Sequence, residues 1–192
     1  MMTRVAIALL ATDLLLAFPV SCLPTPIQSR DHLTPQEVDL VKDAQMLDQR
    51  IEVFIKAADR RLLVLRGVDA ASTKQLKKDS EKWGELPAGT QAELISDIAN
   101  ILDEAITNID DVSTRDERNP LIQKALRKLA TAATRIVDQL KPLRAQARGD
   151  AQIGSFEQLM ENAESIVQAA NRLPPPAEKK EKGKGEKSKD KN

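Results

Sequence analysis

The chain has 192 residues, of which 41% are hydrophobic and only 2% aromatic, and tyrosine is absent. This composition favours an all-α fold whose interior is built from aliphatic and alanine side chains. Lys plus Arg and Asp plus Glu number 29 each, so the chain lacks the positive balance typical of nucleic-acid-binding proteins, and we expect no nucleic-acid partner.

Residues 1–22 are predicted to form a signal peptide or a lipoprotein-type signal. Arg4 precedes an apolar run over residues 5–20, and export signals begin with such a pattern. We therefore expect an exported protein of the bacterial periplasm or outer envelope. Asp13 interrupts the run and argues against a permanent membrane helix, because a carboxylate is costly in the middle of a membrane segment. An uncleaved anchor and an apolar start without a targeting role are the alternatives.

Cys22 is the only cysteine, so no intramolecular disulfide can form. It follows Pro19, Val20 and Ser21 at the end of the apolar run, and this position resembles the lipid-modified cysteine of bacterial lipoproteins, which normally have Leu where this chain has Pro19. The resemblance implies lipidation of Cys22, and loss of Cys22 with the signal is the preferred alternative. Membrane contact is expected only through the N-terminal segment or a lipid on Cys22.

Residues 23–33 are predicted to form a linker, followed by a helical bundle domain over residues 34–173. The domain opens with Thr-Pro-Gln-Glu at residues 34–37, a sequence that favours a capped helix N-terminus. An apolar face then continues to a natural C-terminal cap at Gly67, so the pattern predicts one long helix. The face consists of Leu40, Ala44, Leu47, Ile51, Phe54, Ala58, Leu62 and Leu65.

Arg60 and Arg61 make the second half of this helix basic, together with Lys56. Cations near a helix C-terminus complement the helix dipole, and this is the preferred interpretation. An anion-binding or partner-binding face at Arg60 and Arg61 is the functional alternative.

Residues 69–83 are predicted to form a shorter polar helix on the bundle surface, with Leu76 and Trp83 facing inward. Trp83 is the one aromatic side chain near the turn at residues 84–89. A single Trp that closes a helix onto its neighbours usually serves packing, whereas a recognition role becomes more credible if the ring is exposed.

Residues 90–113 and 120–142 are predicted to form an antiparallel hairpin of an acidic and a basic helix. Each carries apolar residues at spacings of three and four, and one register pairs both stripes. In that register Ile95 meets Ile136 and Leu102 meets Leu129. The same register predicts three surface ion pairs: Glu104 with Arg127, Asp103 with Lys128 and Asp97 with Arg135.

The last helix is predicted over residues 155–173, beginning at a capping box of Ser155 and Gln158. Three prolines follow, and residues 174–192 form a Lys/Glu-rich tail without large apolar side chains. Such a segment is predicted to be disordered. It is expected to solvate the protein, with a weak electrostatic contact to acidic envelope polymers as the alternative.

The residue pattern supports no catalytic, cofactor or metal site. His32 is the only histidine, which excludes serine and cysteine triads and histidine-based metal motifs. His32 itself is expected to be solvated. Asp110, Asp111, Asp116 and Glu117 lack the spacing of a calcium loop. We therefore predict neither an enzyme nor a cofactor.

Two runs, residues 81–90 (EKWGELPAGT) and 108–129 (NIDDVSTRDERNPLIQKALRKL), are similar to those of uncharacterised exported helical proteins from soil bacteria. The resemblance would cover most of residues 33–173. It implies an exported all-helical domain and no particular activity.

Together these observations predict an antiparallel bundle of four to five helices with a disordered C-terminal tail. The function expected is that of a structural or protein-interaction module of the bacterial envelope, which binds an unknown envelope protein or a second copy of itself. A carrier that binds a small molecule or lipid between its helices is the alternative.

Overall fold

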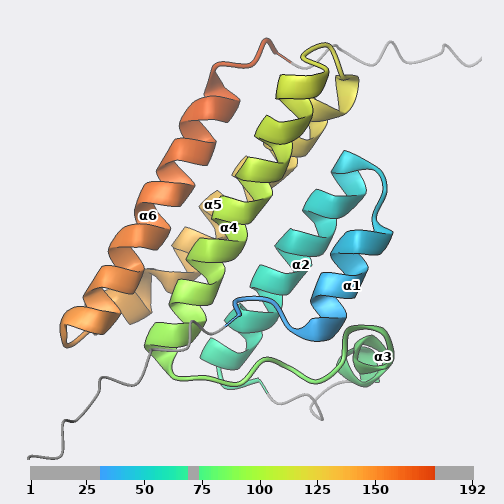
Figure 1. The fold of residues 1–192 in the computed structure, drawn as a ribbon. Helices are drawn as coiled ribbons and strands as arrows, with labels where there is room; N and C mark the ends of the chain where they lie inside the picture. Colours follow the sequence, from blue (N-terminus) through green and yellow to red (C-terminus); the bar gives the residue numbers. More distant parts are fainter. Residues whose placement is uncertain (1–30, 69–73, 176–192) are drawn as a thin grey trace, which may run out of the picture. The chain divides into compact units, whose positions relative to one another are not determined.

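The computed structural model describes residues 31–68 and 74–175, and over these residues α-helix is the only regular secondary structure. The predicted all-α bundle is confirmed, with six described helices in place of four or five (Figure 1). None of the described helices is both long and apolar enough to cross a membrane. The helices are α1 (Pro35–Asp43), α2 (Leu47–Leu65), α3 (Lys74–Trp83), α4 (Gln91–Arg115), α5 (Pro120–Ala145) and α6 (Asp150–Asn171).

The predicted signal over residues 1–22, most of the linker over 23–33 and nearly all of the tail over 174–192 lie outside the described residues. The helices that are described belong to one compact unit, which begins at Asp31. They span residues 35–171.

Four helices, α2, α4, α5 and α6, enclose the core. Within this bundle α4 packs mainly against α2 and α6, and α5 packs against the same two helices. The contact between α4 and α5 is smaller, so these consecutive helices lie across the diagonal of the bundle (Figure 1). The core side chains are fully or almost fully buried, and the largest are Ile51, Phe54, Ile95, Ile98, Ile101, Leu102, Leu129, Ile136, Leu159 and Ile166.

The apolar stripes predicted on α4 and α5 are buried as expected, but the predicted ion pairs between these helices are wrong. The basic residues of α5 pair with α2, which runs parallel to it: Lys124 binds Asp48, Lys128 binds Glu52 and Arg135 binds Asp59. Each pair is separated by 76 residues in the sequence. The hydrogen bond from Lys124 lowers the pKa of Asp48, and the same bond raises the pKa of Lys124.

The acidic residues of α4 also have partners other than α5. Asp97 forms an ion pair with Arg61 of α2, and Glu104 contacts His32, which precedes α1. Arg127, the predicted partner of Glu104, instead donates to the carbonyl of Pro174. Because α4 and α5 lie diagonally, their charged faces point towards different neighbours.

Most helix termini form as the sequence predicts. Thr34 and Glu37 form a capping box at α1, Thr90 and Glu93 form another at α4, and Asn119 caps α5. After α2, the Gly67 amide donates to Val64 and the Val68 amide to Leu63, and Gly67 has a φ of 70°. This is the glycine-dependent C-terminal motif expected there.

The single long helix predicted from Thr34 to Gly67 is wrong. An extended segment between Ala44 and Met46 separates α1 from α2, and α1 folds back alongside α2 (Figure 1). In one continuous helix, Glu37 and Arg60 would lie about 35 Å apart at 1.5 Å per residue. The reversal brings their side chains to 3.0 Å.

The predicted start of the last helix is also wrong. α6 begins at Asp150 after Gly149, whose φ is 78°, and not at Ser155. Ser155 lies inside the helix, where its hydroxyl donates to the carbonyl of Ala151. The apolar face predicted for this helix is nevertheless buried at Phe156, Leu159, Ala163 and Ile166.

Candidate functional site

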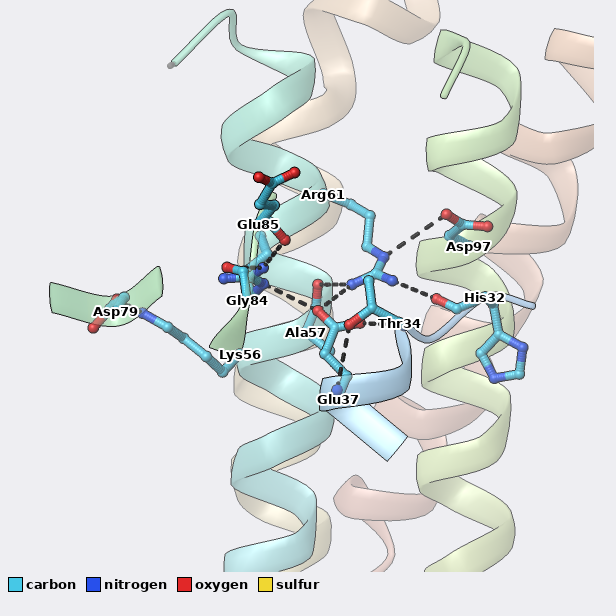
Figure 2. Close-up of polar contacts among 11 residues, drawn as sticks. His32, Thr34, Glu37, Lys56, Ala57, Arg61, Asp79, Gly84, Glu85 and Asp97 are labelled. Atoms are coloured by element: carbon cyan, nitrogen blue, oxygen red, sulfur yellow. Dashed lines mark hydrogen bonds and ion pairs between the residues drawn. The ribbon is translucent and has the colours of Figure 1, made fainter. Parts of the chain in front are cut away.

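A buried ion cluster joins α1, α2 and α4 (Figure 2). At its centre, Glu37 Oε1 accepts hydrogen bonds from Arg60 Nε at 3.0 Å and from Arg61 Nη1 at 2.7 Å. The other oxygen, Oε2, accepts the backbone amide of Thr34 at 2.9 Å in the capping box. Glu37 is 0% exposed, Arg60 2% and Arg61 1%. The carboxylate is therefore held entirely by protein groups.

Arg61 connects the cluster to the segment before α1 and to α4. Its Nη2 donates to the carbonyl of His32 at 2.6 Å, and its Nη1 donates to the carbonyl of Ala57 at 2.9 Å. Its Nε lies 3.8 Å from Asp97 Oδ2 without forming a hydrogen bond in the described structure. One guanidinium group thus links three segments that are far apart in the sequence.

Arg60 connects the cluster to the end of α3. Its Nη2 donates to the carbonyls of Gly84, at 3.2 Å, and Glu85. The ring of Trp83 covers the guanidinium group, with its centroid 5.8 Å from Cζ, a distance at which cation–π attraction contributes. Burial lowers the pKa of Arg60, and the charge of Glu37 opposes that shift.

The contacts of this cluster connect parts of the fold to one another. Glu37 and Asp97 balance the charges of Arg60 and Arg61, and all four side chains are buried. A reacting group must be accessible to its substrate, and these groups contact other parts of the chain instead. In the described residues, no group of three or more His, Cys, Asp and Glu side chains is placed to hold a metal ion.

The structure places the predicted site residues in different environments. Arg60 and Arg61 are buried, so they do not form the exposed anion-binding face considered from the sequence. They also do more than complement a helix dipole, because both bind Glu37. Trp83 is half-buried and packs over Arg60. Cys22 lies outside the described residues.

The environment predicted for His32 is corrected as well. Its Nε2 lies 2.7 Å from Glu104 Oε2, and its side chain is 31% exposed. The end of the predicted linker is therefore held against α4, through this contact and through the His32 carbonyl bound by Arg61. The sequence alone placed no partner beside this histidine.

Sequence analysis missed two members of the cluster, Glu37 and Asp97. Glu37 was identified as a capping residue, and that role accounts for only one of its two oxygens. Asp97 lies on the buried side of α4, between Leu94 and Ile98. A charged residue within an apolar stripe is a signal of a buried partner, and this signal was present in the sequence.

A groove lies beside the cluster, between α1, α2 and the end of α3. It encloses about 400 Å³ and is lined by Leu40, Asp43, Ala44, Gln49, Glu52, Val53, Lys82 and Trp83. Met46, two residues beyond Ala44, is 49% exposed and is one of two large apolar side chains that are exposed in the described structure. The groove therefore combines apolar walls with a polar edge.

Comparisons with known proteins found no matching protein-family model, no matching curated protein and no matching solved structure. The resemblance to exported helical proteins of soil bacteria therefore stays a prediction. The function must be inferred from the geometry of the described residues and from the sequence.

Gly84 offers a test of how closely the end of α3 is fitted to α1. Gly84 and Gly67 both have a φ of 70°, but a Cβ at Gly84 would lie 3.1 Å from the side chain of Gln36, whereas a Cβ at Gly67 would meet nothing within 4 Å. We expect Gly67→Ala to lower the free energy of unfolding by about 1–2 kcal/mol, the cost of a left-handed backbone. Gly84→Ala should cost more, because it also displaces Gln36.

Urea unfolding of the two glycine variants, followed by circular dichroism, measures the difference. Gly67→Ala is the matched control, since it changes the same residue type at the same backbone angle. Equal losses would show that Gln36 moves aside without cost and that the fit between α3 and α1 is loose.

Proposed function

We propose that this protein is an exported, non-enzymatic protein-interaction module of the bacterial envelope, and that it binds its partner at the groove between α1, α2 and α3. Export is supported by the sequence of residues 1–22. Binding of a protein partner is supported mainly by the groove. Trp83 lines it together with Leu40 and Val53, and half-buried aromatic and aliphatic side chains of this kind commonly anchor protein partners.

The charged residues of the groove indicate the chemistry of the partner. Asp43 contributes one carboxylate and Lys82 one ammonium group, whereas Glu52, which also lines the groove, is paired with Lys128 of α5. A complementary partner segment presents an apolar side chain to Trp83 and a basic side chain to Asp43. Electrostatic complementarity of this type guides association and orientation more than it increases affinity.

The alternative function, transport of a small molecule or lipid between the helices, receives less support. The described core is filled by side chains that are fully or almost fully buried. A cavity between α5 and α6, beside Leu140 and Phe156, encloses about 40 Å³. Ligand pockets for small molecules commonly enclose about 300–1,000 Å³, so a ligand enclosed between α5 and α6 would require these two helices to separate.

Site-specific photocrosslinking in cells that produce the protein tests the proposed interaction. A photoreactive amino acid replaces Met46 at the groove, and in a second strain it replaces Glu161, which is exposed on α6, a helix that contacts neither α1 nor α2. We expect a discrete crosslinked product from Met46 and none from Glu161. Its mass identifies a second copy of the 21.2 kDa chain or a different protein.

Two crosslinking results would contradict the proposal. No discrete product from Met46, or the same products from both positions, would contradict a partner site at the groove. Light scattering of the purified protein provides an independent check of self-association, because a dimer would double the measured mass.

A further inference from the structure

The two shortest helices are attached to the bundle differently from the other four. Among the described helices, the backbone of α3 packs against α1 alone, and the backbone of α1 packs only against α2 and α3. Side chains of α3 also reach α2, through Trp83 and Asp79. The other four helices each pack against at least two members of the bundle. The arrangement therefore resembles a four-helix bundle with one added layer (Figure 1).

The added layer is held mainly by charge. Glu37 is the only buried residue of α1, whereas α2 buries eight side chains. Val38 and Val41 are only partly buried against the core. Two buried apolar side chains flank α1: Leu33, which precedes it and is 7% exposed, and Ala44, which ends it and is 8% exposed. A helix with so little apolar burial depends on its polar contacts to stay in place.

Arg60 holds both parts of the layer, whereas Arg61 holds α1 and the segment before it. Arg60 binds Glu37 of α1 and also binds the carbonyls that follow α3. Trp83, the last residue of α3, packs over Arg60. A surface pair between Lys56 and Asp79 adds a further contact between α2 and α3. Loss of Glu37 from the cluster would therefore weaken the attachment of both helices.

We propose that α1 and α3 form a single unit that can detach from the four-helix bundle without unfolding it, and that the buried carboxylate of Glu37 keeps this unit in place. Proteins open locally in cooperative units that contain few buried apolar contacts. Buried ion pairs are well suited to hold such a unit, because they are strong when complete and costly when one partner is removed.

Detachment of the unit would dismantle the groove. α1 supplies Leu40 and Asp43, α3 supplies Lys82 and Trp83, and α2 supplies Val53. The groove therefore exists only while the unit is docked. The inference concerns the chain by itself and does not depend on whether the groove binds a partner.

Hydrogen exchange of the full chain, followed by mass spectrometry, tests the proposal with two matched variants. Glu37→Gln removes the charge but keeps an acceptor for the capping box. Glu93→Gln makes the same change at the same position of the exposed capping box of α4. In E37Q we expect amide exchange in α1 and at residues 78–83 of α3 to accelerate together, on the order of 100-fold. Exchange in α5 and α6 should not change.

Each alternative result would overturn a specific part of the proposal. Acceleration of α1 alone would show that α3 is attached independently, and equal acceleration of all helices would show that no separate unit exists. Unchanged exchange in E37Q, or the same response in E93Q, would show that the Glu37 charge does not hold the unit.

The wild-type protein provides a test that needs no variant. At low urea concentrations, the amides of α1 and α3 should exchange through one opening reaction, with the same free energy of opening and the same urea dependence. That free energy should be smaller than the free energy of opening of α4 and α6. Different urea dependences for α1 and α3 would contradict a common unit. Failure of the crosslinking experiment would leave these exchange results unaffected, so the two proposals can fail separately.

Discussion

Replacing Arg61 with methionine is expected to lower the free energy of unfolding by about 3–5 kcal/mol, which is the usual cost of removing one partner of a buried ion pair. Methionine keeps an apolar stem of similar length but cannot donate hydrogen bonds. Glu37 loses its contact at 2.7 Å, and the carbonyls of His32 and Ala57 lose the hydrogen bonds from the guanidinium group. The measurement is urea unfolding at neutral pH.

The matched control is Arg66→Met, because Arg66 is exposed at the end of the same helix. We expect it to change stability by no more than about 0.5 kcal/mol. A loss in R61M as small as in this control would show that the cluster contributes little. Arg61 also pairs with Asp97, so R61M should accelerate exchange in α4, whereas E37Q should leave most of α4 protected.

Replacing Ile136 with alanine is expected to lower the free energy of unfolding by about 2–5 kcal/mol, the range for deleting a large aliphatic side chain from a packed core. Ile136 is 0% exposed and lies in the centre of α5. Its removal forfeits apolar burial and leaves a cavity that the surrounding helices fill only in part. Thermal or urea unfolding measures the loss.

Ile153→Ala makes the same truncation on α6 at a side chain that is 42% exposed. We expect this control to be neutral or slightly stabilising, because alanine favours the helix more than isoleucine does. Similar losses in I136A and I153A would contradict the assignment of Ile136 to a closely packed core.

The features that sequence analysis predicted correctly depend on interactions close together in the chain. The caps at Thr34, Thr90 and Asn119 use side chains and amides within three residues of each other. The apolar stripes depend on spacings of three and four. Such local patterns define where most helices begin and which face they bury.

The break between α1 and α2 could not be predicted in this way. Neither glycine nor proline occurs at residues 44–46, and the apolar face of α1 continues into α2 at the helical period. The reversal is favoured by contacts made across the fold, above all by Glu37 with Arg60 and Arg61. These pairs form only once the chain has folded back.

The partner of α5 was missed for a related reason. Two regular apolar stripes can always be aligned in some register. The single register that pairs the stripes of α4 and α5 therefore does not distinguish adjacent helices from diagonal ones. The acidic residues of α2, Asp48, Glu52 and Asp59, match the basic face of α5 with one offset. The sequence therefore also supports a parallel pairing of α2 with α5.

The candidate site was only partly predictable. Arg60, Arg61 and Trp83 were selected from the sequence, and the structure brings all three together. Their carboxylate partner, Glu37, was concealed by its capping role. The groove could not be predicted at all, because its walls come from three helices whose arrangement depends on the reversal after α1.

The diagonal placement of α4 and α5 has a consequence for the order in which this chain can mature. Two consecutive helices that are neighbours in a bundle can bury their apolar faces against each other as soon as the second helix emerges from the ribosome, whereas two diagonal helices need a third helix between them. Here α2 and α6 are the helices that bridge α4 and α5, and α6 is the last of the described helices to be synthesised. A nascent or truncated chain that lacks α6 therefore exposes apolar side chains along α4. Such incomplete products are expected to be substrates for chaperones and quality-control proteases.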